Sequence, residues 1–288
     1  MTETALRYPR LFASLVKIEH TIFALPFAYI GAFLAVDGIP SAHDLFWITV
    51  AMLGARSLAM ALNRLIDARI DARNPRTAGR EIPRGALTPP QVVLFCVLSL
   101  IVFLVAVFQL APIVHWLWPI PVAGFVIYPY LKRFTWLSHL WLGAVDGLAP
   151  VGAWVAITGQ LPLEAWLLGA AVACWVAGFD CFYALLDLEF DRREGLKSVA
   201  TAFGVHGAIW AARILHIATI GFLLWAGELL DIGVFYWLGV AAVAVLLIYE
   251  HALVRPLNLR RLDAAFFFVN GIISLTFFAF VLVDVLVS

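Results

Sequence analysis

The chain has 288 residues, of which 64% are hydrophobic and 13% are charged. Soluble domains contain about 45–50% apolar and about 25% charged residues, so this composition excludes a water-soluble globular domain. Nineteen basic and nineteen acidic residues cancel, so no bulk charge points to a nucleic-acid partner. The three cysteines lie in apolar runs without a CxxC or metal-ligand spacing, which argues against a disulfide framework. We predict a polytopic, all-α membrane protein.

Nine apolar segments are long enough to cross a hydrocarbon core about 30 Å thick, which requires roughly 20 apolar helical residues. The predicted transmembrane helices are approximately 18–37, 44–67, 90–110, 112–131, 137–158, 162–187, 206–227, 232–252 and 264–287. The third and fourth are separated only by Leu110–Pro112, which makes this the least secure boundary. No soluble domain, long linker or low-complexity tract interrupts the pattern, so we expect residues 1–288 to form a single domain.

The basic residues predict how these helices are oriented in the cell membrane. With nine spans, all Lys and Arg residues of the N-terminal segment and the loops lie on one face of the membrane. They are Arg7, Arg10, Lys17, Arg69, Arg73, Arg76, Arg80, Arg84, Lys132, Arg133, Arg192, Arg193, Lys197, Arg255, Arg260 and Arg261. The alternate loops, near residues 38–43, 111, 159–161 and 228–231, contain none. By the positive-inside rule the basic face is cytoplasmic, so we expect a cytoplasmic N-terminus and an external C-terminus.

Two acidic motifs stand where predicted helices reach the cytoplasmic face. Asn63, Asp67 and Asp71 are spaced i, i+4 and i+8 and therefore share one helix face. In the second motif Asp180, Tyr183, Asp187 and Asp191 stand at offsets 0, 3, 7 and 11, so they also share one helix face. Stacked carboxylates repel one another, and a divalent cation removes that repulsion. Hard oxygen ligands suit Mg²⁺, which commonly shares its coordination shell with substrate phosphates.

A simpler reading is that these acids only end helices at the water interface, paired with Arg64, Arg69, Arg73, Arg192 and Arg193. Two such motifs on the same side, each with further polar residues deeper on the same stripe, favour the metal site over this reading.

The charged residues Arg56, Asp146 and Asp180 lie inside predicted transmembrane helices, away from their ends. A charge at the centre of a membrane helix costs about 2.5–3.5 kcal/mol on insertion scales, so these side chains should face a polar cavity or one another. Arg56 paired with either aspartate would hold the bundle together, and such a pair would also line a pocket. We treat the seven histidines as interfacial or core residues, because none forms an HxxxH or HExxH pattern.

Basic loop residues follow the acidic motifs, and the positive-inside rule alone explains most of them. Arg76 and Arg80 follow the first motif, and Lys197 follows the second. Lys132 and Arg133 follow the predicted fourth span. Beside acids that bind a metal, such cations are what a phosphate-bearing substrate requires.

The residues 63–85, NRLIDARIDARNPRTAGREIPRG, and 180–204, DCFYALLDLEFDRREGLKSVATAFG, resemble the two signature motifs of UbiA-type intramembrane aromatic prenyltransferases. The first resembles that family's NxxxDxxxD and the second its DxxYAxxDxxxD. The first-span segment KIEHTIFALPFAYIGA is similar to one bacterial and archaeal subgroup. The sequence departs from the hydroxybenzoate enzymes of that family in two details: the residue after Asn63 is Arg rather than the common Asp, and Leu186 and Leu188 flank Asp187. These departures concern the identity of the acceptor more than the type of reaction.

The resemblance implies a helical bundle around a central cavity, capped by cytoplasmic loops. It implies five Mg²⁺–diphosphate ligands, namely Asn63, Asp67, Asp71, Asp187 and Asp191. It implies diphosphate contacts from Arg76, Lys132 and Lys197, with Tyr128 and Tyr183 nearby. Arg56 and Asp180 would lie in the acceptor pocket with catalytic roles, and Asp146 is added to them only by analogy.

The reaction that the resemblance implies is Mg²⁺-dependent transfer of a prenyl group from a polyprenyl diphosphate, geranyl diphosphate or longer, to the ring of 4-hydroxybenzoate in quinone synthesis. A dihydroxynaphthoate acceptor in menaquinone synthesis is the alternative, and haem or lipid acceptors rank lower. From a different class, a transporter would also carry intramembrane charges. Its charges should lie at the midplane, whereas these acidic motifs lie near one face.

Overall fold

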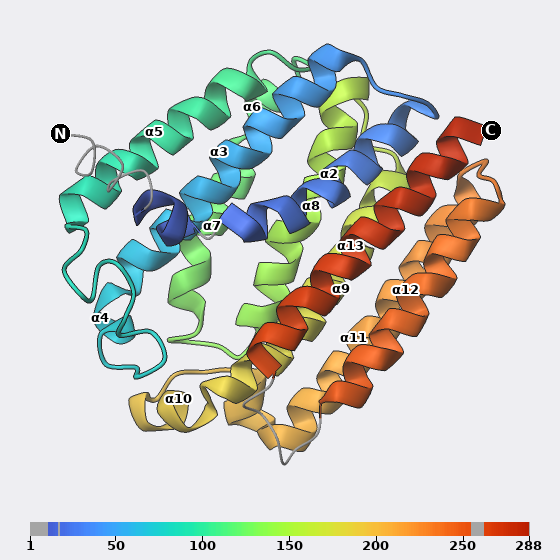
Figure 1. The fold of residues 1–288 in the computed structure, drawn as a ribbon. Coiled ribbons are helices and arrows are strands. Elements are labelled where there is room, and N and C mark those ends of the chain that lie inside the picture. The colour runs from blue at the N-terminus through green and yellow to red at the C-terminus, as the bar shows by residue number, and fades with distance from the viewer. Residues whose placement is uncertain (1–10, 17, 255–261, 288) are drawn as a thin grey trace.

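The computed structural model describes residues 11–16, 18–254 and 262–287, and every helix in this part of the chain belongs to one bundle (Figure 1). The helices are α2 (Ile18–Val36), α3 (Ala42–Ile66), α4 (Ala68–Asp71), α5 (Pro89–Val107), α6 (Val114–Leu117), α7 (Pro119–Leu131), α8 (Ser138–Thr158), α9 (Leu163–Leu186), α10 (Leu188–Glu194), α11 (Val199–Leu229), α12 (Val234–Leu253) and α13 (Leu262–Val287). The prediction of an all-α membrane protein is confirmed.

Seven helices of the described residues are long and apolar enough to cross a membrane. They are α3, α5, α8, α9, α11, α12 and the Phe268–Val287 part of α13, while the Leu25–Val36 part of α2 is apolar but shorter. The count of nine spans therefore stays a prediction.

The predicted fourth span, 112–131, is not one continuous helix. A four-residue helix, α6, is followed by a turn at Trp118 and then by α7, which has 13 residues and begins at Pro119. Proline lacks a backbone N–H and is accommodated in the first helical turn, so Pro119 starts a new helix.

Helix α9 lies at the centre of the packing and is the most buried of the seven candidate spans. It packs between α8 and α11, while α2 packs on α8 and α13 packs on both α2 and α12. Glycines allow α8 to approach α9 closely, because a Cβ added at Gly143 would lie 2.1 Å from the Ala173 carbonyl oxygen and one at Gly147 would lie 2.4 Å from the Gly169 oxygen. Small residues at such crossings are typical of membrane helices.

The short helices α4 and α10 follow α3 and α9 directly and lie toward the same end of the bundle, at the lower left of Figure 1. Helix α11 begins at Val199, seven residues earlier than predicted, where Ser198 caps it by accepting a hydrogen bond from the Thr201 N–H (3.0 Å). Gly204, with φ 72°, kinks α11 near its start. Both acidic motifs and the loops after them therefore meet at one end of the bundle.

Candidate active site

The two acidic motifs have the same local backbone structure. Asp67 ends α3 with φ −90° and ψ 2°, and Asp187 ends α9 with φ −103° and ψ 2°. Each motif then continues in a short helix, where the Asp71 N–H donates to the Asp67 carbonyl and the Asp191 N–H donates to the Asp187 carbonyl, both at 2.8 Å. The predicted spans 44–67 and 162–187 therefore end within one residue of α3 and α9, and the i+4 hydrogen bond keeps the last two acids of each motif in helical register.

The loop after the first motif binds the second motif. The Arg76 Nε donates to Asp187 Oδ1 at 2.8 Å, and its Nη2 donates to Asp187 Oδ2, so the contact is bidentate. The Asn74 amide donates to the same carboxylate at 3.0 Å. Bidentate arginine–carboxylate contacts fix geometry as well as charge. These contacts bring together motifs that are more than 100 residues apart in the sequence.

The acids of the first motif are also paired with basic residues. Asp67 is 2% exposed and contacts the Lys132 Nζ at 2.9 Å and the Arg133 Nη2 at 3.1 Å. Asp71 is 4% exposed and accepts a hydrogen bond from the Arg80 Nη1 at 2.6 Å. Buried carboxylates at this end of the bundle are therefore compensated by cations from three different loop positions.

These cations differ from the ones that a simple helix-end pairing would use. Of the five arginines considered for that role, Arg73 pairs with Glu194 at 2.8 Å instead of with a motif aspartate. The cations that contact the motif acids come from the loop after α4, with Arg76 and Arg80, and from the C-terminal end of α7, with Lys132 and Arg133.

Lys132 acts on both motifs. Besides contacting Asp67, its charge lowers the pKa values of Asp187 and Asp191. Burial and the neighbouring Asp187 carboxylate nevertheless raise the pKa of Asp191 to about 6. Burial also opposes ionisation of Asp187, but hydrogen bonds and charge from Arg76 bring its pKa below the usual value. The two motifs thus face one site, where closely spaced carboxylates are stabilised by nearby cations.

The donor chemistry of this site fits Mg²⁺ that is shared with a phosphate. Within the described ranges no three His, Cys, Asp or Glu side chains come close enough to hold a metal ion by themselves. Mg²⁺ is usually bound through one or two carboxylates plus substrate phosphates and water, so an all-protein cage is not required. Burial and the neighbouring Asp187 carboxylate raise the pKa of Asp191, and a bound cation would relieve this repulsion.

The deeper polar residues form a second group beside the acidic motifs. Arg56 on α3 contacts Asp146 on α8, with 3.4 Å between Nη1 and Oδ1, so its partner is Asp146 and not Asp180. Asp180 on α9 contacts the His139 Nδ1 at 2.7 Å. Tyr128 on α7 lies among these charges, with Asp180 and Asp67 as its strongest charged neighbours. Three predicted catalytic residues and one predicted substrate residue therefore come together.

Other predicted residues lie at the edge of this arrangement. Asn63 is half-buried one turn before Asp67, whose N–H donates to the Asn63 carbonyl at 3.0 Å. Tyr183 packs on Phe179, with ring centroids 6.4 Å apart. The Lys197 side chain is exposed, but its backbone N–H donates to the Lys132 carbonyl at 2.6 Å and so fixes the two basic loops together.

Sequence reasoning missed the roles of His139 and Asn74. The prediction of a core histidine suits His216, which is 3% exposed and contacts His251 at 3.0 Å, but His139 contacts a predicted catalytic carboxylate. No spacing in the sequence relates His139 to Asp180, 41 positions away. Arg133 was expected, with Lys132, as a cation for a phosphate-bearing substrate, and the structure places it against Asp67.

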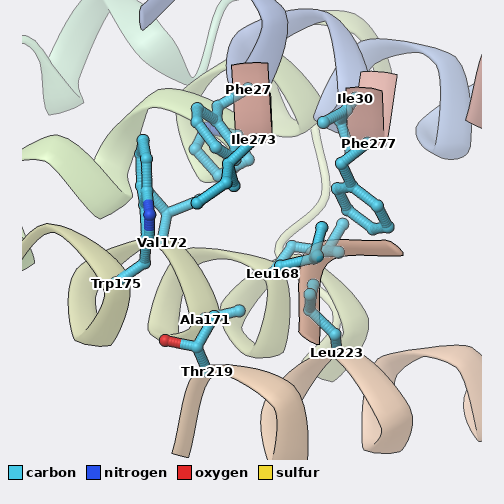
Figure 2. A pocket seen from close by; sticks show the side chains of 12 residues that line it. Phe27, Ile30, Leu168, Ala171, Val172, Trp175, Thr219, Leu223, Ile273 and Phe277 are labelled. Carbon is cyan, nitrogen blue, oxygen red and sulfur yellow. The ribbon is translucent and has the colours of Figure 1, made fainter. Parts of the chain in front are cut away.

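A small apolar cavity lies elsewhere in the bundle, between α2, α8, α9, α11, α12 and α13 (Figure 2). Its volume is about 20 Å³, close to that needed for one water molecule. The Thr219 hydroxyl at its edge already donates to the Leu215 carbonyl at 3.1 Å. No residue predicted for the site lines this cavity, and it is too small for an isoprenoid chain.

Comparison with known proteins agrees with the motifs. Residues 24–272 match the model of the UbiA prenyltransferase family. The 4-hydroxybenzoate octaprenyltransferase of Pseudoalteromonas translucida is 31% identical over 93% of this chain and 92% of its own length. The protein of that name from Xanthomonas euvesicatoria pv. vesicatoria is 34% identical over 86% of this chain and 80% of its own length.

Solved structures show the same fold. A UbiA homologue from Aeropyrum pernix, in its apo form, has a TM-score of 0.83 and 32% identity and covers 92% of this chain and 98% of its own. A UbiA homologue from Archaeoglobus fulgidus bound to GPP and Mg²⁺ has a TM-score of 0.74 over 96% of this chain and all of its own, at 17% identity.

Proposed function

The chain belongs to the UbiA prenyltransferase family, and on this basis we propose that it transfers a prenyl group from a polyprenyl diphosphate to the ring of an aromatic acid, with 4-hydroxybenzoate as the first candidate. The observation that carries the proposal is the position of the two polar groups. The charged group around Asp67 and Asp187 suits a diphosphate, and it adjoins the group of Arg56, Asp146 and Asp180 through Tyr128.

The diphosphate side uses the acidic motifs and the basic loops. Asn63, Asp67, Asp71, Asp187 and Asp191 would hold Mg²⁺ together with phosphate oxygens, as hard oxygen ligands. When bound, the ion neutralises the charge that develops on the leaving diphosphate. Beside the ion, the phosphate oxygens are bound by three cations, Arg76, Lys132 and Lys197. Tyr128 and Tyr183 lie near the same phosphates. Fixed positive groups at a leaving group lower the barrier most where water is excluded.

The acceptor side uses the deeper group. Arg56 binds the acceptor carboxylate, and Asp146 at 3.4 Å orients the guanidinium. Asp180 orients the ring hydroxyl or accepts its proton. The ring carbon next to that hydroxyl attacks the allylic carbon as the bond to the diphosphate breaks, and the proton on that ring carbon then passes to the released diphosphate, which restores the aromatic ring. Apolar helices around the site keep water from capturing the allylic cation.

The membrane arrangement supports this assignment of roles. We propose nine transmembrane segments in one domain of residues 1–288, with a cytoplasmic N-terminus. The acidic motifs and basic loops then face the cytoplasm, where water-soluble acceptors and diphosphate head groups are accessible, while the prenyl chain remains in the membrane lipid.

The proposal is tested with the purified protein, geranyl diphosphate, Mg²⁺ and either 4-hydroxybenzoate or a dihydroxynaphthoate, with the products resolved by mass. We expect a Mg²⁺-dependent adduct that is lost in D67A and in D187A. The matched control is E189Q, which removes an exposed carboxylate from the same short helix as Asp191 and should remain active.

The choice of acid identifies the acceptor. An adduct with the dihydroxynaphthoate alone would replace 4-hydroxybenzoate in the proposal and keep the reaction. Full turnover by folded D67A and D187A would refute the role of the motifs, and an absence of diphosphate binding would refute the enzyme assignment.

A further inference from the structure

The His139 side chain connects three helices at the edge of the acceptor site. It stands in the first turn of α8, and its side chain is only 7% exposed. Its Nδ1 lies 2.7 Å from Asp180 Oδ2 on α9. The backbone N–H of Val199, the first residue of α11, donates to its Nε2 at 3.2 Å. Both ring nitrogens therefore have a partner.

The Val199 contact determines which ring nitrogen carries the proton. A backbone N–H can only donate, so the His139 Nε2 must accept with its lone pair. In the neutral ring the proton then resides on Nδ1, which donates to Asp180. The two contacts are satisfied together by one tautomer and one ring orientation, so the direction of the Nδ1–H is fixed by α11.

The remaining carboxylate oxygen of Asp180 is left for another partner. His139 contacts Oδ2, and among the described residues no second side chain donates a hydrogen bond to Asp180. The Asp180 side chain is 18% exposed, and its charge acts on Tyr128 and on Asp146. Its carboxylate therefore lies between His139 and the polar group of the acceptor site.

We infer that His139 is a positioning residue for the acceptor: by holding Asp180 Oδ2, it keeps the carboxylate in one orientation and leaves Oδ1 to bind the ring hydroxyl. This inference rests on the proposed function. It concerns a residue to which the family motifs assign no role.

The same histidine also connects the acceptor side to the diphosphate side. Val199 follows the loop of Lys197, and the Lys197 N–H donates to the Lys132 carbonyl at 2.6 Å. The His139 ring thus fixes Asp180 relative to the backbone that carries both basic residues. Such fixed geometry matters because a misplacement of about 1 Å can cost roughly 100-fold in rate.

Two conservative variants separate the contacts of the ring. In H139N the side-chain amide stands where Nδ1 does and can still donate to Asp180, but it does not reach Val199. In H139Q the side-chain amide oxygen stands where Nε2 does and accepts from the Val199 N–H, so this contact is kept and the Asp180 contact is lost. Steady-state kinetics of both variants are measured with geranyl diphosphate and the aromatic acid, and binding of an unreactive thio analogue of geranyl diphosphate is measured separately.

We expect H139Q to lower kcat about 10- to 100-fold, because a hydrogen bond to a charged group at the reacting hydroxyl is lost. H139N should stay within roughly threefold of the wild type, and binding of the thio analogue should be unchanged in both. Equal losses in the two variants, or no loss in H139Q, would overturn the inference, because a merely structural role does not distinguish the two ring nitrogens.

A measurement without turnover separates this inference from the proposed function. The ¹⁵N NMR shifts of labelled His139 report which nitrogen carries the proton. A proton on Nδ1, with a shift that changes in D180N, supports the pairing, and a proton on Nε2 overturns the inference. Wild-type protein that makes no adduct would overturn the proposed function instead.

Discussion

Substitution of Gly143 by alanine tests whether the close packing of α8 on α9 positions the site. The added Cβ would lie 2.1 Å from the Ala173 carbonyl oxygen and 3.1 Å from the Ala177 Cβ. Contacts below 3.0 Å essentially do not occur, so the helices must separate there by at least about 0.9 Å. Gly143 stands one turn after His139, so this movement stretches the 2.7 Å contact with Asp180 beyond hydrogen-bond length.

The magnitude follows from two opposing effects. Overpacking a tight contact costs about 1–3 kcal/mol, whereas replacing glycine by alanine inside a helix gains about 1 kcal/mol. We expect the net destabilisation of G143A to be about 0–2 kcal/mol, equivalent to an apparent Tm that is lower by up to several degrees. Turnover should fall by about 10-fold or more, since the Asp180 carboxylate, which orients the acceptor, loses its fixed position.

The control lies on the same helix. A Cβ added at Gly152 meets nothing within 4 Å, so G152A should be neutral or slightly stabilising and fully active. Both variants are compared by thermal melting in detergent and by the prenyl-transfer assay. An unchanged melting temperature and full turnover for G143A would refute the argument that backbone contact between α8 and α9 sets the site.

Two further predictions concern carboxylates in different roles. D284A should lower the free energy of unfolding by about 1–2 kcal/mol without changing KM, because Asp284 caps α12 by accepting from the N–H groups of Gly233, Phe235 and Tyr236; thermal melting and kinetics together check this. Because the pKa of Asp191 is raised to about 6, its carboxylate is lost as the pH falls through that value, so Mg²⁺ affinity should weaken by up to about tenfold per pH unit below 6. Titration with Mg²⁺ in the presence of the thio analogue measures this, and a D191N variant with the same pH dependence would contradict it.

The helices and the acidic motifs could be predicted because their signals are local. The lengths of the apolar runs predicted the helical segments. The i, i+4 spacing of Asp67 with Asp71 and of Asp187 with Asp191 is kept where α4 and α10 begin. The predicted spans 44–67 and 162–187 ended at Asp67 and Asp187, but the bend from α3 into α4 and from α9 into α10 was not predictable from that spacing. An i, i+4 pattern is compatible with an unbroken helix, and the bend depends on the loops that bind the motif acids.

The sequence limited the ion-pair partner of Arg56 to two aspartates but did not decide between them. Arg56 had two candidate partners in the sequence, and the structure gives Asp146, which leaves Asp180 to His139. Hydropathy places all these residues at comparable depth, but the partner depends on how far α8 and α9 rotate about their axes. That rotation is set by glycine contacts such as Gly143 on Ala173, whose effect is visible only when both helices are in place.

The sequence by itself determined the membrane class, the helical segments and the two acidic motifs, because composition, apolar length and i, i+4 spacing act within one segment of chain. Only the tertiary structure decided that Arg76 binds Asp187, that Lys132 lies between the motifs and that His139 contacts Asp180. Charged groups interact over a few ångströms in a low-dielectric interior, so a chemical site exists only where helix packing brings distant residues within that range.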